Sequence, residues 1–119
     1  ARWCVAGRRL LRAFCSEAGV GYRECGKLIV AVGDDETARL EELLALGQAN
    51  GVEDLELLDA AACLRLEPQV AAVAALHSPR TGILDAEGAA RALARRAAEH
   101  GAGVLTSAPV AGLEDTPEG

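Results

Sequence analysis

Hydrophobic positions along this 119-residue chain follow two patterns, a helical spacing and short continuous apolar runs. Helical spacing and capping residues predict helices at 2–18, 35–49, 60–66 and 86–99. Apolar runs predict strands at 22–32 and 70–77, an extended segment at 54–59, and two short strands within 104–113 on either side of Ala108-Pro109. We therefore expect an α+β fold, with the strand segments 26–32 and 70–77 in one sheet and helix 35–49 covering one of its faces.

Glycine, asparagine and aspartate residues mark the ends of the predicted helices. Gly19 ends the first helix, Asn50-Gly51 closes the second, and Gly101 ends the fourth. Asp59 and Asp85 are placed to cap the third and fourth helices. The apolar end of strand 22–32 is continuous rather than alternating, which predicts that both of its faces are covered.

Two helices have faces that predict their packing. In helix 2–18 the apolar stripe includes Trp3, Leu10 and Cys15, and three arginines lie opposite, so the stripe is expected to face the core. In helix 86–99 the small residues suit close packing on a sheet, and they include Ala89, Ala90, Leu93, Ala97 and Ala98.

Composition narrows the functional classes. The net charge is −6, from 12 basic and 18 acidic residues, which argues against nucleic acid as the main partner. No apolar run approaches the ~20 residues of a membrane span, and nothing resembles a signal peptide. We expect a reducing, cytoplasmic setting, in solution or peripheral to a membrane.

The four cysteines do not form a metal-binding pattern. Cys4, Cys15, Cys25 and Cys63 include no Cys-x-x-Cys pair, and neither histidine lies at ligand spacing from them. Cys4 and Cys15 are eleven residues apart, about three helical turns, so they are expected to share one buried face. Core thiols are favoured over disulfides or metal ligands, and we predict no metal site.

His77 is the candidate catalytic residue, because imidazole can act as an acid, a base or a ligand near neutral pH. The alternative is a structural role, in which His77 lies at the end of a strand and its ring nitrogens form hydrogen bonds within the protein. Ser78 lacks the Gly-x-Ser-x-Gly elbow of a nucleophile, and no Asp or Glu is placed in the sequence to orient His77.

Lys27 is the candidate substrate-binding residue. Two interpretations of Lys27 in "CGKLIV" stay open. It contacts a carboxylate or phosphate of the substrate, or it is a lysine at the start of a strand whose side chain reaches solvent. The glycines make neither a Gly-x-Gly-x-x-Gly motif nor a P-loop. Residue chemistry alone therefore gives no complete active site.

The order of motifs resembles FAD-dependent oxidoreductases of the D-amino-acid-oxidase-like superfamily, and within it the L-2-hydroxyglutarate dehydrogenases. The matching stretches are Cys-Gly-Lys-Leu at 25–28, Leu-Glu-Pro at 66–68 and Leu-His-Ser-Pro-x-Thr-Gly-Ile-x-Asp at 76–85. The resemblance implies an enzyme that oxidises a small 2-hydroxy acid by hydride transfer to FAD. It leaves open an amino acid, an amine or glycerol 3-phosphate as the substrate.

The resemblance also implies a division of the chain. Residues 1–21 would be a helix connecting from the FAD domain, 22–82 a segment of the substrate domain on a mixed sheet, and 83–119 a return to the Rossmann-like FAD domain. "HSPRTG" would be the crossing between the two domains. By resemblance, the backbone of Val110 contacts the adenine edge of FAD.

The glycine-rich unit that holds the FAD pyrophosphate does not occur in these residues. The chain therefore resembles a middle fragment, inactive by itself, which we expect to bind no FAD. Residues 115–119, "DTPEG", resemble a hairpin turn without a partner strand. Without the rest of the FAD domain, helices 2–18 and 86–99 lack the sheet that would cover their apolar faces. Exposed apolar faces predict that the fragment self-associates. The alternative is a non-enzymatic α+β interaction module without a cofactor.

Overall fold

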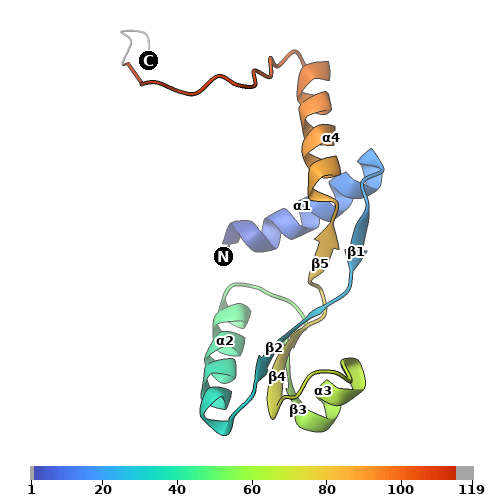
Figure 1. Ribbon diagram of the computed structural model, residues 1–119, viewed down its shortest axis with the longest axis vertical. Coiled ribbons are helices and arrows are strands. Elements are labelled where there is room, and N and C mark those ends of the chain that lie inside the picture. The colour runs from blue at the N-terminus through green and yellow to red at the C-terminus, as the bar shows by residue number, and fades with distance from the viewer. Residues whose placement is uncertain (1, 115–119) are drawn as a thin grey trace.

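Two small antiparallel sheets follow one another along the long axis of the molecule, whose extents are 59 × 35 × 26 Å (Figure 1). The computed structural model describes residues 2–114. Its elements in chain order are α1 (Arg2–Ala18), β1 (Tyr22–Glu24), β2 (Lys27–Ala31), a 3-10 turn (Asp34–Glu36), α2 (Thr37–Ala49), β3 (Glu56–Asp59), α3 (Ala60–Leu66), β4 (Ala74–Ser78), β5 (Gly82–Leu84) and α4 (Ala86–Glu99). The predicted α+β fold is confirmed.

The larger sheet has the strand order β2-β4-β3, and all its pairs are antiparallel. Helices α2 and α3 lie on opposite sides of it (Figure 1). Ala31, Leu40 and Leu76 form the buried core between this sheet and α2. The prediction that segments 26–32 and 70–77 share one sheet under helix 35–49 is therefore confirmed.

The predicted single strand 22–32 is wrong, because the chain bends between β1 and β2. Gly26 has a φ of +75°, a conformation outside the pleated range, and glycine adopts it without steric cost. The N–H groups of Cys25 and Gly26 both donate to the carbonyl of Thr81, at 3.1 and 2.9 Å. The bend places β1 in a two-stranded sheet with β5 and leaves β2 in the larger sheet.

The second predicted strand, 70–77, begins later than expected and has an unpredicted successor. Residues 70–73 lie outside β4, and β5 follows the turn at Pro79-Arg80. The prediction that both faces of β2 are covered is also wrong, because Val30 is 38% exposed. The side chains of α3 do not reach the whole of that face.

Residues 102–114 form neither of the two short strands predicted within 104–113. Val104, Leu105, Val110 and Leu113 are exposed there. A strand is stable only when its backbone pairs with a neighbour, and no described strand lies beside this segment. The hairpin turn predicted at 115–119 lies outside the described residues.

The predicted apolar stripe of α1 is buried only toward the C-terminal end of the helix. Cys15 is fully buried, whereas Trp3 is 81% and Leu10 72% exposed. Arg8 and Arg12, on the predicted polar face, pair with Glu24 of β1. Cys4 is exposed and Cys15 is buried, so the prediction of a buried face shared by the two thiols is wrong.

Helix α4 begins as predicted, with the Asp85 side chain accepting a hydrogen bond from the Gly88 N–H at 2.9 Å. Its buried residues are Ala89 and Ala92, whereas Leu93 is 53% exposed, so the predicted packing face is only partly right. The helix packs on α1. No helix within residues 2–114 has both the length and the apolar character needed to cross a lipid bilayer.

Candidate functional site

A shallow hollow of about 410 Å³ lies on the α3 side of the larger sheet. It contains both site residues predicted from the sequence, together with a thiol and several apolar side chains. Its lining consists of Cys25, Gly26, Lys27, Leu28, Val30, Leu66, Glu67, Val70 and His77.

His77 has a carboxylate partner that the sequence did not reveal. The pairing of β3 with β4 places Glu56 directly opposite His77, and Glu56 Oε1 lies 3.0 Å from His77 Nδ1. The expectation that no Asp or Glu orients His77 is therefore wrong. The two residues are 21 positions apart, and only the strand register brings them together.

This contact selects the tautomer of the neutral imidazole. An ionised carboxylate only accepts hydrogen bonds, so Nδ1 carries the proton and donates it to Glu56. The other nitrogen, Nε2, is then an acceptor, and it lies near Gly26, where a Cβ atom would be 3.3 Å away. With a side chain that is 18% exposed, His77 offers a fixed basic nitrogen at the rim of the hollow.

Lys27 borders the same hollow, but its side chain belongs to the other face of the sheet. The register places Lys27 opposite Ser78 and Leu28 opposite His77. Successive residues of a strand point to opposite faces, so Lys27 and His77 do not converge from one face. Lys27 is exposed at the start of β2, where an acidic molecule can reach it.

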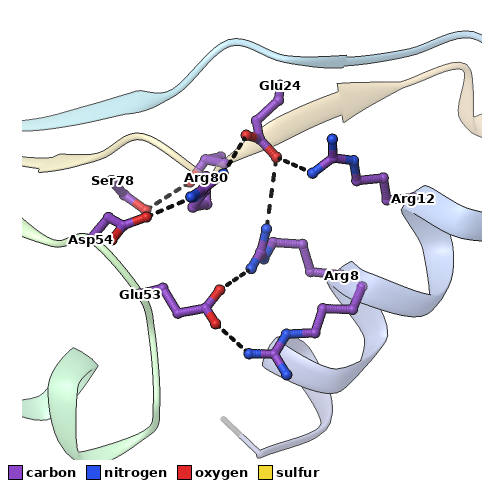
Figure 2. Close-up of polar contacts among 9 residues, drawn as sticks. Arg8, Arg12, Glu24, Glu53, Asp54, Ser78 and Arg80 are labelled. Atoms are coloured by element: carbon purple, nitrogen blue, oxygen red, sulfur yellow. Dashed lines mark hydrogen bonds and ion pairs between the residues drawn. The ribbon is translucent and has the colours of Figure 1, made fainter.

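A second polar cluster joins α1 to the turn between β4 and β5 (Figure 2). Glu53 accepts from Arg8 at 2.9 Å and from Arg9 at 2.5 Å. Glu24 pairs with Arg12 at 3.3 Å and lies 3.8 Å from Arg8. We call this set the arginine cluster; its members are Arg8, Arg9, Arg12, Arg80, Glu24, Glu53 and Asp54.

Arg80 connects this cluster to the crossing between the two sheets. Its Nε donates to Asp54 at 2.7 Å, and its Nη1 lies 3.5 Å from Glu24. The hydrogen bond and the charge of Asp54, followed by the charge of Glu24, raise the pKa of Arg80. Asp54 itself has a φ of +59°, in the left-handed region that Asp tolerates better than most residues.

The sequence pattern did not single out the arginine cluster. Arg8, Arg9 and Arg12 lie opposite the apolar stripe of their helix, which by itself indicates no partner for them. The available signal was the unusual run of arginines in a chain with net charge −6. Among residues 2–114, no group of three or more His, Cys, Asp or Glu side chains could hold a metal ion.

The family described as "FAD dependent oxidoreductase" (DAO) matches residues 1–119, the whole chain. The chain belongs to this family. It is 39% identical over 118 residues to the human L-2-hydroxyglutarate dehydrogenase, mitochondrial, covering 99% of this chain and 26% of that protein. The corresponding Arabidopsis thaliana protein is 46% identical over 85 residues, which are 71% of this chain and 18% of that protein. The chain thus spans about a quarter or less of these DAO-family relatives.

Two solved structures of flavoenzymes have a similar fold. L-proline dehydrogenase from P. horikoshii has a TM-score of 0.77 at 22% identity, over 84% of this chain and 27% of that chain. At that identity the likeness shows the DAO fold alone. Glycine oxidase from Geobacillus kaustophilus has a TM-score of 0.68 at 26% identity, over 79% of this chain and 27% of that chain.

FAD is named in the description of the DAO family. Segment 102–114 has no regular secondary structure, and Val110 within it is 81% exposed. The contact of the Val110 backbone with adenine stays a prediction. No glycine-rich strand-turn-helix cradle for a pyrophosphate occurs in residues 2–114, so a complete FAD site needs further residues.

Proposed function

We propose that this chain is part of an FAD-dependent oxidoreductase that oxidises a small 2-hydroxy acid of the L-2-hydroxyglutarate class. The observation that carries the proposal is the 39% identity to the human L-2-hydroxyglutarate dehydrogenase across 99% of the chain. The match of the whole chain to the DAO family supports the flavin-dependent reaction class.

A bound flavin would supply the redox chemistry, as the acceptor of the hydride from the C–H bond next to the substrate hydroxyl. The chain's own residues position the substrate and handle protons. In this proposal the larger sheet belongs to the substrate domain (residues 22–82), and residues 83–119 return to the FAD domain. The change from one sheet to the other at the turn after β4 supports a crossing at "HSPRTG", although β1 (Tyr22–Glu24), on the substrate-domain side of this division, pairs with β5.

Lys27 and His77 take different roles in this proposal. Lys27, exposed at the start of β2, attracts a carboxylate of the substrate through its charge. His77, held by Glu56 with Nε2 free of a proton, receives a proton from the substrate hydroxyl or hydrogen-bonds to it. The alternative is a structural role for His77, in which Glu56 only accepts the hydrogen bond of its partly buried ring.

A second candidate function is the oxidation of an amino acid or amine. Glycine oxidases support it, since those from Bacillus cereus and Geobacillus kaustophilus are 28% and 26% identical to this chain, with TM-scores of 0.60 and 0.68. The higher identity to the L-2-hydroxyglutarate dehydrogenases favours the hydroxy acid.

The test uses the full-length protein that carries this chain, purified with its flavin and mixed with substrates without oxygen. L-2-hydroxyglutarate is expected to bleach the flavin absorbance, whereas D-2-hydroxyglutarate, glycine and L-proline leave it oxidised. Bleaching by glycine or L-proline alone establishes the second candidate. A full-length protein that contains no flavin and reduces no acceptor contradicts both and favours the interaction module.

We also propose a reducing compartment for the protein. All four cysteines are free thiols, and two of them, Cys15 and Cys63, are buried. The L-2-hydroxyglutarate dehydrogenases in the comparison carry the word mitochondrial in their names. The cytoplasm expected from the sequence and the matrix of an organelle both satisfy the thiol chemistry.

A further inference from the structure

The described chain consists of two structural units that follow one another along its long axis (Figure 1). The large-sheet unit contains β2, α2, β3, α3 and β4, and the small-sheet unit contains α1, β1, β5 and α4. The apolar core around Leu40 and Leu76 lies in the large-sheet unit. Cys15, Ala89 and Ala92 are buried in the small-sheet unit. Each unit therefore has buried apolar residues of its own.

Two short backbone segments connect the units. Residues 25–26 lead from β1 to β2, and residues 79–81 lead from β4 to β5. The carbonyl of Thr81 accepts hydrogen bonds from the N–H groups of Cys25 and Gly26, at 3.1 and 2.9 Å, so the two crossings lie side by side. A hinge consists of a few such residues, which absorb a change of backbone dihedral angles between rigid elements. The paired crossings have the arrangement of a hinge.

Beside this hinge, α1 meets the loop that precedes β3 through charged side chains. Glu53 of the loop accepts from Arg8 at 2.9 Å and from Arg9 at 2.5 Å. A hollow of about 490 Å³ lies at the same junction, and apart from Ala13 its lining residues are polar or charged. Units that meet without a large apolar interface are expected to move relative to one another.

Arg80 adds a contact at the crossing itself (Figure 2). Its Nε donates to Asp54 of the large-sheet unit at 2.7 Å, and its Nη1 lies 3.5 Å from Glu24 of the small-sheet unit. One guanidinium thus joins a carboxylate of each unit. Asp54 has a φ of +59°, an unfavourable conformation that its contact with Arg80 helps to hold.

The strength of these contacts suits a reversible latch, a name we give to the ion pairs Arg8–Glu53, Arg9–Glu53 and Arg80–Asp54. Their side chains are between 46% and 61% exposed, except that of Arg8, which is 24% exposed. Salt screens exposed charges, and one exposed ion pair shifts an equilibrium by up to about five-fold. Three such pairs favour one arrangement of the units without fixing it.

We propose that the two units rotate about the crossings at 25–26 and 79–81, and that Glu53 and Asp54 latch the closed arrangement. In the open arrangement the ion pairs of the latch are broken, and α1 lies farther from the loop that precedes β3. The rotation moves the hollow that contains His77 relative to the small-sheet unit. The inference does not rest on the proposed oxidation, because its readout is a distance and requires no turnover.

The experiment measures the distance between the units in the full-length protein by double electron–electron resonance. Genetically encoded nitroxide residues replace Gln48 of α2 and Arg95 of α4, which are both exposed. Two separations are expected in the otherwise unchanged protein, and the closed one should be the more populated. Glu53→Gln combined with Asp54→Asn removes the latch, so it should raise the ratio of open to closed about ten-fold. Arg39→Gln is the matched control and should leave the ratio unchanged, because Arg39 pairs within α2.

Salt tests the latch without a substitution in it. Raising the ionic strength from about 0.1 M to about 1 M shortens the Debye length from about 10 to about 3 Å. This change should raise the open-to-closed ratio of the protein with an intact latch, and it should have much less effect on the double variant. Circular dichroism checks the fold of each variant, and asparagine tolerates the positive φ at position 54. A single separation that neither the double variant nor salt changes overturns the proposal, as does an equal effect of Arg39→Gln.

Discussion

His77 Nδ1 lies 3.0 Å from Glu56 Oε1, and this contact joins the central strand β4 to the edge strand β3. The carboxylate fixes the ring and directs Nε2 toward Gly26 and the hollow. Any role of His77 in chemistry therefore depends on a partner 21 residues away.

We expect His77→Ala to lower kcat/KM of the full-length enzyme about ten- to a hundred-fold, as for the loss of a hydrogen bond to a charged group. Glu56→Gln should lower kcat/KM by a smaller factor, because Nδ1 of His77 loses its carboxylate partner and the ring is held less firmly. Steady-state kinetics checks both variants. If neither variant alters kcat/KM, the pair is structural.

Lys27→Ala is expected to raise KM for an acidic substrate about ten-fold or more, because a charged contact to the substrate carboxylate disappears. Lys27→Arg, which keeps the charge, should retain most of the affinity. Initial-rate measurements with the hydroxy acid test this prediction. Equal KM values in the wild type and Lys27→Ala would return Lys27 to the role of a solvent-exposed strand residue.

Gly26→Ala should destabilise the fold by about 1–2 kcal/mol, since a side chain in the left-handed region is strained. The new Cβ would also lie 3.3 Å from the His77 ring. Gly7→Ala in α1 is the matched control: nothing lies within 4 Å of its Cβ position, and alanine in a helix is favoured by about 0.5–1 kcal/mol. Urea unfolding measures both, and equal free energies of unfolding would contradict the role of Gly26.

Local features of the fold were predictable from the sequence because neighbouring residues determine them. Asp59 and Asp85 cap their helices as expected, accepting from Ala62 and Gly88. Gly19 and Gly101 end theirs with positive φ. The apolar stripe around Leu40 also packs on the sheet as its spacing predicted.

Features set by distant residues were not predictable in the same way. The Glu56–His77 contact depends on the register of β3 with β4, and sequence spacing does not encode that register. The ion pairs of Arg8 with Glu24 and Glu53 join α1 to residues far along the chain, and the helical spacing does not reveal these partners. The bend at Gly26 could not be predicted, because it depends on β1 pairing with β5 in one sheet and β2 pairing with β4 in the other.

Val110→Pro is expected to reduce FAD retention of the full-length protein, because proline has no backbone N–H to contact adenine. The substrate domain should keep its fold, since Val110 lies in the exposed segment after α4. The flavin-to-protein absorbance ratio after gel filtration measures retention, with Val104→Pro as a control in the same segment. Undiminished flavin in Val110→Pro would show that this backbone position does not contact the cofactor.

Anaerobic reduction of the flavin by L-2-hydroxyglutarate tests the central claim most directly. The full-length protein is mixed with L-2-hydroxyglutarate in a stopped-flow spectrometer, and the oxidised flavin absorbance is followed over time. The account predicts rapid bleaching whose rate saturates with substrate concentration, and no bleaching by the D isomer. A flavin that stays oxidised with L-2-hydroxyglutarate but is bleached by an amino acid would contradict it.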